Sequence, residues 1–222
     1  MPITLTWEGP VALVRWDDGE NRINLDSLAR LHELLDEVEA QAGPRALVVT
    51  GAGKFFSNGL DLPRFMEDPA QLGATLAELH RTLARLFLFP AYTVAALNGH
   101  TFAAGALVGC GLDYRVMRED RGYWCMNEVD IGMALDQKLA AILFARLPRA
   151  TVIHAMLTGH RFGASEALAY GIIQETATEE AVVPRALEVA AAMADKDRDI
   201  IAAHKRLAFA EVVAILGSAP TG

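Results

Sequence analysis

Short apolar runs alternate with amphipathic segments through the first half of the chain. VALVRW (11–16), ALVVT (46–50) and YTVAAL (92–97) are almost entirely apolar and only five or six residues long. Such runs indicate buried strands. The amphipathic segments between them give a βαβ-like order, so the pattern favours an α/β fold in which helices cover a sheet.

Helical periodicity marks two of the segments between these strands. Apolar residues recur at helical spacing over 25–38, and Gly43-Pro44 ends that series. A second series covers 72–86, and 55–65 is expected to be a loop. FAAGALVGCGL (102–112) is apolar on every side, which is typical of a fully buried helix.

The second half of the chain is predicted to be mainly helical. Further strands are expected at 113–117 and 123–126, and helices at 135–147, at 151–157 and after Gly163. No Ser/Gly-rich or charged linker divides the 222 residues. We therefore expect an α/β core over residues 1–165 and a short helical C-terminal region over 166–222, as parts of one domain.

Composition excludes several classes of function. The net charge of −8, without a basic cluster, argues against nucleic acid as a partner. Residues 91–112 lack charged side chains and are long enough to span a bilayer, but Asn98-Gly99 predicts a turn in their middle. We expect two buried elements there and no membrane contact.

The cysteines and the N-terminus predict a location in the cytoplasm. Cys110 and Cys125 lie in apolar surroundings and lack a metal-ligand spacing, which indicates two buried thiols in a reducing compartment. The first ten residues, MPITLTWEGP, contain neither a basic nor an apolar region of a signal peptide.

Glu128 is the unusual residue of the segment YWCMNEVDIG (123–132), which reads as a buried strand. Burial of an ionised carboxylate without a partner is costly. Glu128 therefore either reaches solvent at a strand end or is kept buried because it is reactive. The residue pattern alone favours the first interpretation.

Four segments together resemble one known family. They are ALVVTGAGKFFSNGLDL, AALNGHTFAAGALVGCGLDYRVM, YWCMNEVDIG and MLTGHRFGASEALAYGIIQE. In order and spacing they resemble the enoyl-CoA hydratase/isomerase (crotonase) superfamily from about Val11 to Glu175, and the details are similar to the Δ3,Δ2-enoyl-CoA isomerase branch. The resemblance implies a spiral of ββα units with two sheets, a helical trimerisation region, and a homotrimer or hexamer.

The resemblance also implies a catalytic site. Its oxyanion hole would consist of the backbone N–H groups of Leu60 and Ala104, and its acid/base would be Glu128. Where hydratases carry a second glutamate, this chain has Leu107. Hydration requires a group that orients water and a group that moves a proton, whereas moving a double bond requires one base. The implied reaction is conversion of a 3-enoyl-CoA to a trans-2-enoyl-CoA.

The acyl-CoA contacts are likewise implied by the resemblance. The expected residues are Ser57, Asn58, Gly59, Leu60, Asp61, Leu62, Ala103, Gly105 and Leu107. Lys54 or Arg64 would meet the CoA phosphates, and the acyl tail would lie along Phe65, Met66, Leu83 and Phe87. No metal and no cofactor is expected, because the substrate carries coenzyme A.

Other chemistry-bearing residues are read as structural. Asp130 and His100 are expected to support the fold, and Asp61 to accept hydrogen bonds from loop N–H groups. Cys125 lacks the His or Asp partner that a nucleophile needs. GAGK (51–54) has neither the P-loop nor the dinucleotide-binding spacing, so it predicts a strand-exit turn.

Two alternatives to the isomerase stay open. One is another one-glutamate enzyme acting on CoA thioesters: a thioesterase, a decarboxylase or a dienoyl-CoA isomerase. The last would be expected to carry an additional acidic residue near the pocket, and Leu107 argues against it. The other is a non-catalytic acyl-CoA-binding or assembly subunit, against which the retention of Glu128 argues.

Overall fold

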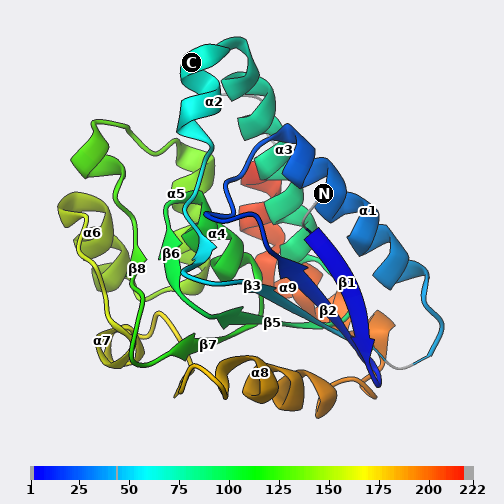
Figure 1. Cartoon of the computed structure of the whole chain (residues 1–222). Coiled ribbons are helices and arrows are strands. Elements are labelled where there is room, and N and C mark those ends of the chain that lie inside the picture. Colours follow the sequence, from blue (N-terminus) through cyan, green and yellow to red (C-terminus); the bar gives the residue numbers. More distant parts are fainter. Residues whose placement is uncertain (1–2, 44, 218–222) are drawn as a thin grey trace.

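The computed structural model describes residues 3–43 and 45–217, which form two sheets surrounded by helices (Figure 1). The strands are β1 (Ile3–Glu8), β2 (Val11–Trp16), β3 (Ala46–Gly51), β4 (Phe55–Ser57), β5 (Tyr92–Leu97), β6 (His100–Phe102), β7 (Tyr114–Arg118), β8 (Trp124–Cys125) and β9 (Glu175–Ala177). The α-helices are α1 (Leu25–Ala40), α2 (Leu62–Glu67), α3 (Ala70–Phe87), α4 (Ala104–Gly111), α5 (Gln137–Arg146), α6 (Arg149–Thr158), α7 (Ala164–Ala169), α8 (Val182–Ala191) and α9 (Arg198–Gly217). A 3-10 helix, η1, covers Glu128–Ile131.

The larger sheet has the strand order β1-β2-β3-β5-β7-β9. β1 and β2 form an antiparallel hairpin, and every later pair in this sheet is parallel. The smaller sheet, β4-β6-β8, is also parallel. The predicted α/β class and crotonase-like fold are confirmed.

The two faces of the larger sheet are covered by different helices, because successive side chains of a strand point to opposite faces. On one face Leu13, Val48 and Val94 pack against Val182 and Ala186 of α8. Figure 1 shows α8 below the sheet, while α1, α3, α4 and α9 lie on the other side. The main core forms on that second side.

Helix α4 lies in the centre of this core, as its apolar sequence predicts. All eight of its residues are buried. Gly105 makes close packing possible, since a Cβ there would lie 2.7 Å from the Cβ and the carbonyl oxygen of Ser57 in β4. The first turn of α4 is thereby held against the end of β4.

A buried ion pair joins α9 to this core. Lys205 Nζ lies 2.5 Å from Asp113 Oδ2 and donates a hydrogen bond to the Ala91 carbonyl at 2.8 Å. The same Asp113 oxygen accepts a hydrogen bond from the Thr93 N–H, and Asp113 Oδ1 lies 3.3 Å from Arg146 of α5. One carboxylate therefore connects β5, α5 and α9.

The structure corrects three local predictions. Glu128 begins a 3-10 helix and does not lie in a strand, because β8 ends at Cys125 and Gly132 closes η1 with φ +67°. The expected loop 55–65 contains β4 and the start of α2. The region 166–222 also contributes β9, which pairs with β7; the boundary before residue 166 stays a prediction.

Within 3–43 and 45–217, no helix combines the length and the apolar character that crossing a bilayer requires.

Two glycines of α4 give a matched test of this packing. Gly105→Ala should lower the free energy of unfolding by about 1–3 kcal/mol, because its methyl group overlaps Ser57. Gly109→Ala should leave it unchanged or raise it by roughly 0.5–1 kcal/mol, because its Cβ meets Leu97 at an ordinary 3.5 Å and alanine favours the helix. Urea unfolding of both variants measures the difference, and equal stabilities would contradict the close contact.

Candidate active site

The turn that follows β4 and the turn that leads from β6 into α4 meet at the start of α4. Gly59 follows β4 with φ +82°, and a Cβ there would lie 3.0 Å from Ala103 Cβ and 3.4 Å from the Ala104 nitrogen. The Gly59 N–H donates to Ser57 Oγ at 3.2 Å, and that hydroxyl donates to the Asn21 carbonyl at 2.7 Å. The loop after β4 is thus fixed beside the N-terminus of α4.

Unpaired backbone donors are found in both turns. Within the part of the chain that the structure describes, neither the Leu60 N–H nor the Ala104 N–H has a hydrogen-bond acceptor. Their neighbours are paired: the Asp61 N–H donates to Ile23 and the Ala103 N–H to Cys125. Ala104 is the first residue of α4, where helix geometry leaves N–H groups free and the helix dipole favours negative charge.

Ala103 has a backbone conformation that alanine rarely adopts. Its φ is +50° and its ψ is −120°, which costs about 1–3 kcal/mol. This conformation turns the chain from β6 into α4, and it precedes the free N–H of Ala104. Strain at this point is typical of a functional site.

A cavity of about 320 Å³ lies beside these donors. Its wall is mostly apolar, with a few polar groups. The lining residues are Arg22, Asn58, Leu60, Leu62, Leu76, Ala103, Ala104, Leu107, Asn127, Glu128, Ile131, Met133, Ala134, Leu135, Asp136 and Leu139. Both predicted oxyanion residues and the predicted acid/base therefore share one cavity, together with Leu107.

Glu128 reaches the cavity from η1 and is half-buried. Its Oε2 is buried and has no hydrogen-bond partner among the described residues. Burial raises the pKa of Glu128 above its ordinary value of 4.5, although its own backbone N–H opposes this by stabilising the anion. A carboxyl group with a raised pKa is suited both to accept and to return a proton.

The apolar surroundings predicted for Glu128 are only partly correct. Leu107 and Ile131 line the same cavity, and Trp124 is fully buried. Tyr123, which precedes β8, and Val129 of η1 instead have 41% and 47% of their surface exposed.

The predicted acyl-CoA residues fall into two groups. Asn58, Leu60, Leu62, Ala103 and Leu107 line the cavity. Ser57, Gly59, Asp61 and Gly105 lie in the turns behind it, and their contact with acyl-CoA stays a prediction. Asp61 accepts a hydrogen bond from the Asn24 side chain at 3.0 Å, which differs from the expected role with loop N–H groups.

The predicted tail residues need correction. Leu83 and Phe87 are fully buried in the main core, Phe65 is also buried, and 84% of Met66 is exposed. Leu83 and Phe87 lie on the same stripe of α3 as Leu76, but two and three turns further along, where the helix is buried in the main core. Phe65 and Met66 belong to α2. The structure provides an alternative apolar wall at Leu62, Leu76 and Leu139.

Three polar lining residues were missed from the sequence: Arg22, Asn127 and Asp136. Asp136 could have been found, since an Asp directly before an apolar helical run is an N-cap signal. Its Oδ1 accepts the Leu139 N–H at 2.7 Å. Asp136 therefore adds a second carboxylate to the cavity.

Residues read as structural lie outside the cavity. His100 belongs to an aromatic cluster with Phe55, Phe102 and Tyr123, at ring distances of 5.1–5.6 Å. Asp130 packs against Gly159, where an added Cβ would lie 2.6 Å from its carboxylate. Burial raises the pKa of the Cys125 thiol to about 12, which opposes nucleophilic use.

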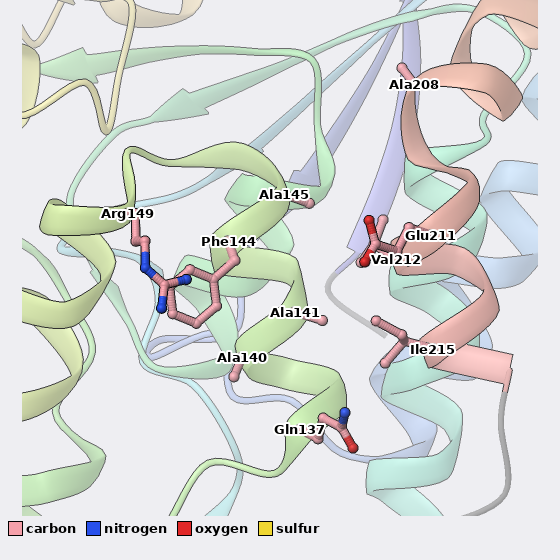
Figure 2. A pocket seen from close by; sticks show the side chains of 10 residues that line it. All are labelled: Gln137, Ala140, Ala141, Phe144, Ala145, Arg149, Ala208, Glu211, Val212 and Ile215. Carbon is pink, nitrogen blue, oxygen red and sulfur yellow. The ribbon is translucent and has the colours of Figure 1, made fainter.

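A second hollow, of about 440 Å³, lies between α5 and α9. Figure 2 shows alanines of α5 on one side and Glu211, Val212 and Ile215 of α9 on the other. Arg149 stands over the Phe144 ring at 5.2 Å. None of the residues predicted for the site lines this hollow.

Family membership follows from comparison with known proteins. The model of the family described as "Enoyl-CoA hydratase/isomerase" matches residues 7–214. The chain belongs to the enoyl-CoA hydratase/isomerase family. The resemblance inferred from the four sequence segments is confirmed.

Relatives within the enoyl-CoA hydratase/isomerase family bear both names. The peroxisomal enoyl-CoA delta isomerase 2 of Arabidopsis thaliana is 33% identical, over 90% of this chain and 88% of its own. A putative enoyl-CoA hydratase of Thermus thermophilus is 37% identical, over 85% of this chain and 75% of its own. A solved structure titled as an enoyl-CoA isomerase of Mycobacterium tuberculosis has a TM-score of 0.90 and 30% identity, covering 97% of this chain and 94% of its own.

The buried carboxyl of Glu128 gives a test by stability. Because its pKa is raised in the folded state, the folded state binds the proton more tightly than the unfolded chain does. Stability is therefore lost as pH rises from below 4.5 through the raised pKa. Glu128→Gln should melt at a higher temperature than the wild type at pH 8, and the difference should shrink at pH 4. The same difference at both pH values would contradict burial of the charge.

Proposed function

We propose that the protein is a Δ3,Δ2-enoyl-CoA isomerase. The observation that carries this proposal is the shared cavity, in which the free N–H groups of Leu60 and Ala104 and the carboxyl of Glu128 meet an aliphatic wall at Leu107. The names of the Arabidopsis and Mycobacterium relatives support it.

In the proposed mechanism the thioester oxygen accepts hydrogen bonds from the Leu60 and Ala104 N–H groups. These donors stabilise the enolate that forms when the C2 proton leaves, and one such donor is typically worth about 3–4 kcal/mol. Glu128 removes the proton from C2. The electron pair of that C–H bond forms the C2=C3 bond, and the electrons of the original C3=C4 bond take a proton at C4 from the same carboxyl.

Leu107 favours isomerisation over hydration. Its side chain is fully buried and offers no hydrogen bond to water. Asp136 is the additional carboxylate of the cavity. Its Oδ1 accepts a hydrogen bond at the N-terminus of α5, and its Oδ2 lies beside His80. The buried Oε2 of Glu128, in contrast, has no hydrogen-bond partner among the described residues.

The assay uses two substrates and one variant. The wild type should convert 3-hexenoyl-CoA to 2-hexenoyl-CoA, seen as conjugated enoyl absorbance, without hydrating added 2-hexenoyl-CoA. Glu128→Gln should lower kcat by about 10²–10⁴-fold and keep acyl-CoA affinity. Hydration of 2-hexenoyl-CoA would overturn the argument from Leu107. Full activity of the variant would place the base elsewhere, and acyl-CoA binding without turnover by the wild type would support a pure binding subunit.

A second candidate is a dienoyl-CoA isomerase, which the cavity position of Asp136 favours. The argument against it rested on Leu107 alone, and Asp136 supplies the additional acid from another element. In this reaction Glu128 would remove the C2 proton of a 3,5-dienoyl-CoA and Asp136 would deliver a proton to C6, giving the 2,4-diene.

The effect of Asp136→Asn separates the two candidates. The dienoyl reaction requires a proton from Asp136, so this variant should lose turnover of 3,5-octadienoyl-CoA and keep that of 3-hexenoyl-CoA. Ultraviolet absorbance of the conjugated products measures both. If the wild type does not convert the diene, the second candidate is wrong.

The proposal also covers the oligomeric state, the pathway, the location and the cofactors of the protein. We infer a homotrimer or hexamer, a role in fatty acid β-oxidation and a cytoplasmic location, with no metal and no cofactor beyond the coenzyme A of the substrate. Lys54 and Arg64 are the proposed phosphate contacts. Arg64 pairs with Asp26 at 2.7 Å in the free protein, so it would exchange this partner for the phosphate.

A further inference from the structure

His80 and Asp136 meet at the border of the cavity from two different helices. His80 follows cavity-lining Leu76 by one turn of α3, so both lie on the same face of that helix. Its imidazole is only 11% exposed, and Nε2 lies 3.1 Å from Asp136 Oδ2. Nε2 has no well-aligned hydrogen bond to any residue in the described ranges, so its approach to Asp136 is a close contact and not a hydrogen bond.

Asp136 is itself held in place. Its Oδ1 caps α5 through the Leu139 N–H, and both Asp136 and Leu139 line the cavity. The contact with His80 therefore links α3 to the N-terminus of α5. Burial lowers the pKa of His80, more than neighbouring Asp136 raises it, and the charge of Lys138 lowers it further. The lowered pKa favours the neutral form of the His80 imidazole at neutral pH.

α3 and α5 both contribute to the cavity wall, through Leu76 and Leu139. Both pack on α4 and on α9. They approach each other again near their C-terminal ends, where the Arg146 guanidinium lies 4.7 Å from the Phe87 ring centre. An acyl chain that extends between the two helices past Leu76 therefore has to displace the His80–Asp136 contact.

We propose that the His80–Asp136 contact closes the acyl end of the cavity and sets the length of acyl chain that the site accepts. This inference rests on the proposed function for the identity of the ligand as an acyl-CoA. His80 acts as a specificity-determining residue, because it faces Asp136 and does not touch the reacting carbons. The buried imidazole occupies the space between α3 and the N-terminus of α5, so a longer acyl chain has no room there while the ring is in place.

The test compares His80→Ala, which opens the border, with His80→Gln, which keeps a donor for Asp136. The dissociation constants of saturated acyl-CoA from hexanoyl to tetradecanoyl are measured by calorimetry, together with kcat and KM for the matching 3-enoyl-CoA. In His80→Ala the affinity for tetradecanoyl-CoA should rise about tenfold relative to hexanoyl-CoA. His80→Gln should keep the wild-type order, and kcat for 3-hexenoyl-CoA should stay unchanged in both.

His32→Ala is the matched control. His32 Nε2 lies 3.0 Å from Glu78 of α3, which is a similar histidine–carboxylate contact. His32 belongs to α1, however, and neither residue lines the cavity. This variant should leave the length preference unchanged, and thermal melting shows that each variant is folded.

Two results would overturn the proposal. One is an unchanged ratio of affinities in folded His80→Ala. The other is a fall in kcat that is equal at every chain length, which would place His80 in the chemistry through Asp136. Absence of turnover by the wild type would instead overturn the isomerase function, while the affinities of the saturated acyl-CoA would still test the role of His80.

Discussion

The unpaired N–H groups at the start of α4 determine where the rest of the site must lie. α4 is buried on every side, so its position is fixed by the core, and its first residue, Ala104, lines the cavity. The loop after β4 reaches this end because Gly59 and Gly105 allow the two backbones to touch. The strained Ala103 then places the Ala104 N–H next to the turn that carries Leu60.

Electrostatics and packing cooperate in the rest of the cavity. The apolar wall that excludes water also raises the pKa of Glu128, so the same side chains shape the space and tune the base. In the proposed mechanism the N–H groups of Leu60 and Ala104 act at the thioester oxygen, where negative charge develops. In the proposed mechanism a single carboxyl beside two fixed donors is sufficient for moving a double bond. Leu107 stands where hydratases carry a second glutamate, so this position supplies no second carboxyl.

Strands and helices with strong periodicity were predicted well from the sequence. β2 and β5 have the predicted bounds, and α4 was recognised from its uniform apolarity. The 3-10 helix at Glu128 was missed because its four residues look like a continuation of β8, and tertiary packing on α6 decides their conformation. The cavity walls could not be deduced, since the direction of each residue of α3 depends on packing with α4 and α9. Asp136 and His80 are far apart in sequence, so their meeting needed the fold.

The position of α8 along the chain affects how the protein is made. α8 covers the Leu13, Val48 and Val94 face of the larger sheet, and it spans Val182–Ala191. A ribosome therefore completes most of the sheet before it synthesises the helix that shields this face. Until then the nascent chain presents this apolar face without the helix that shields it, and exposed apolar surface makes an incompletely folded chain prone to aggregation.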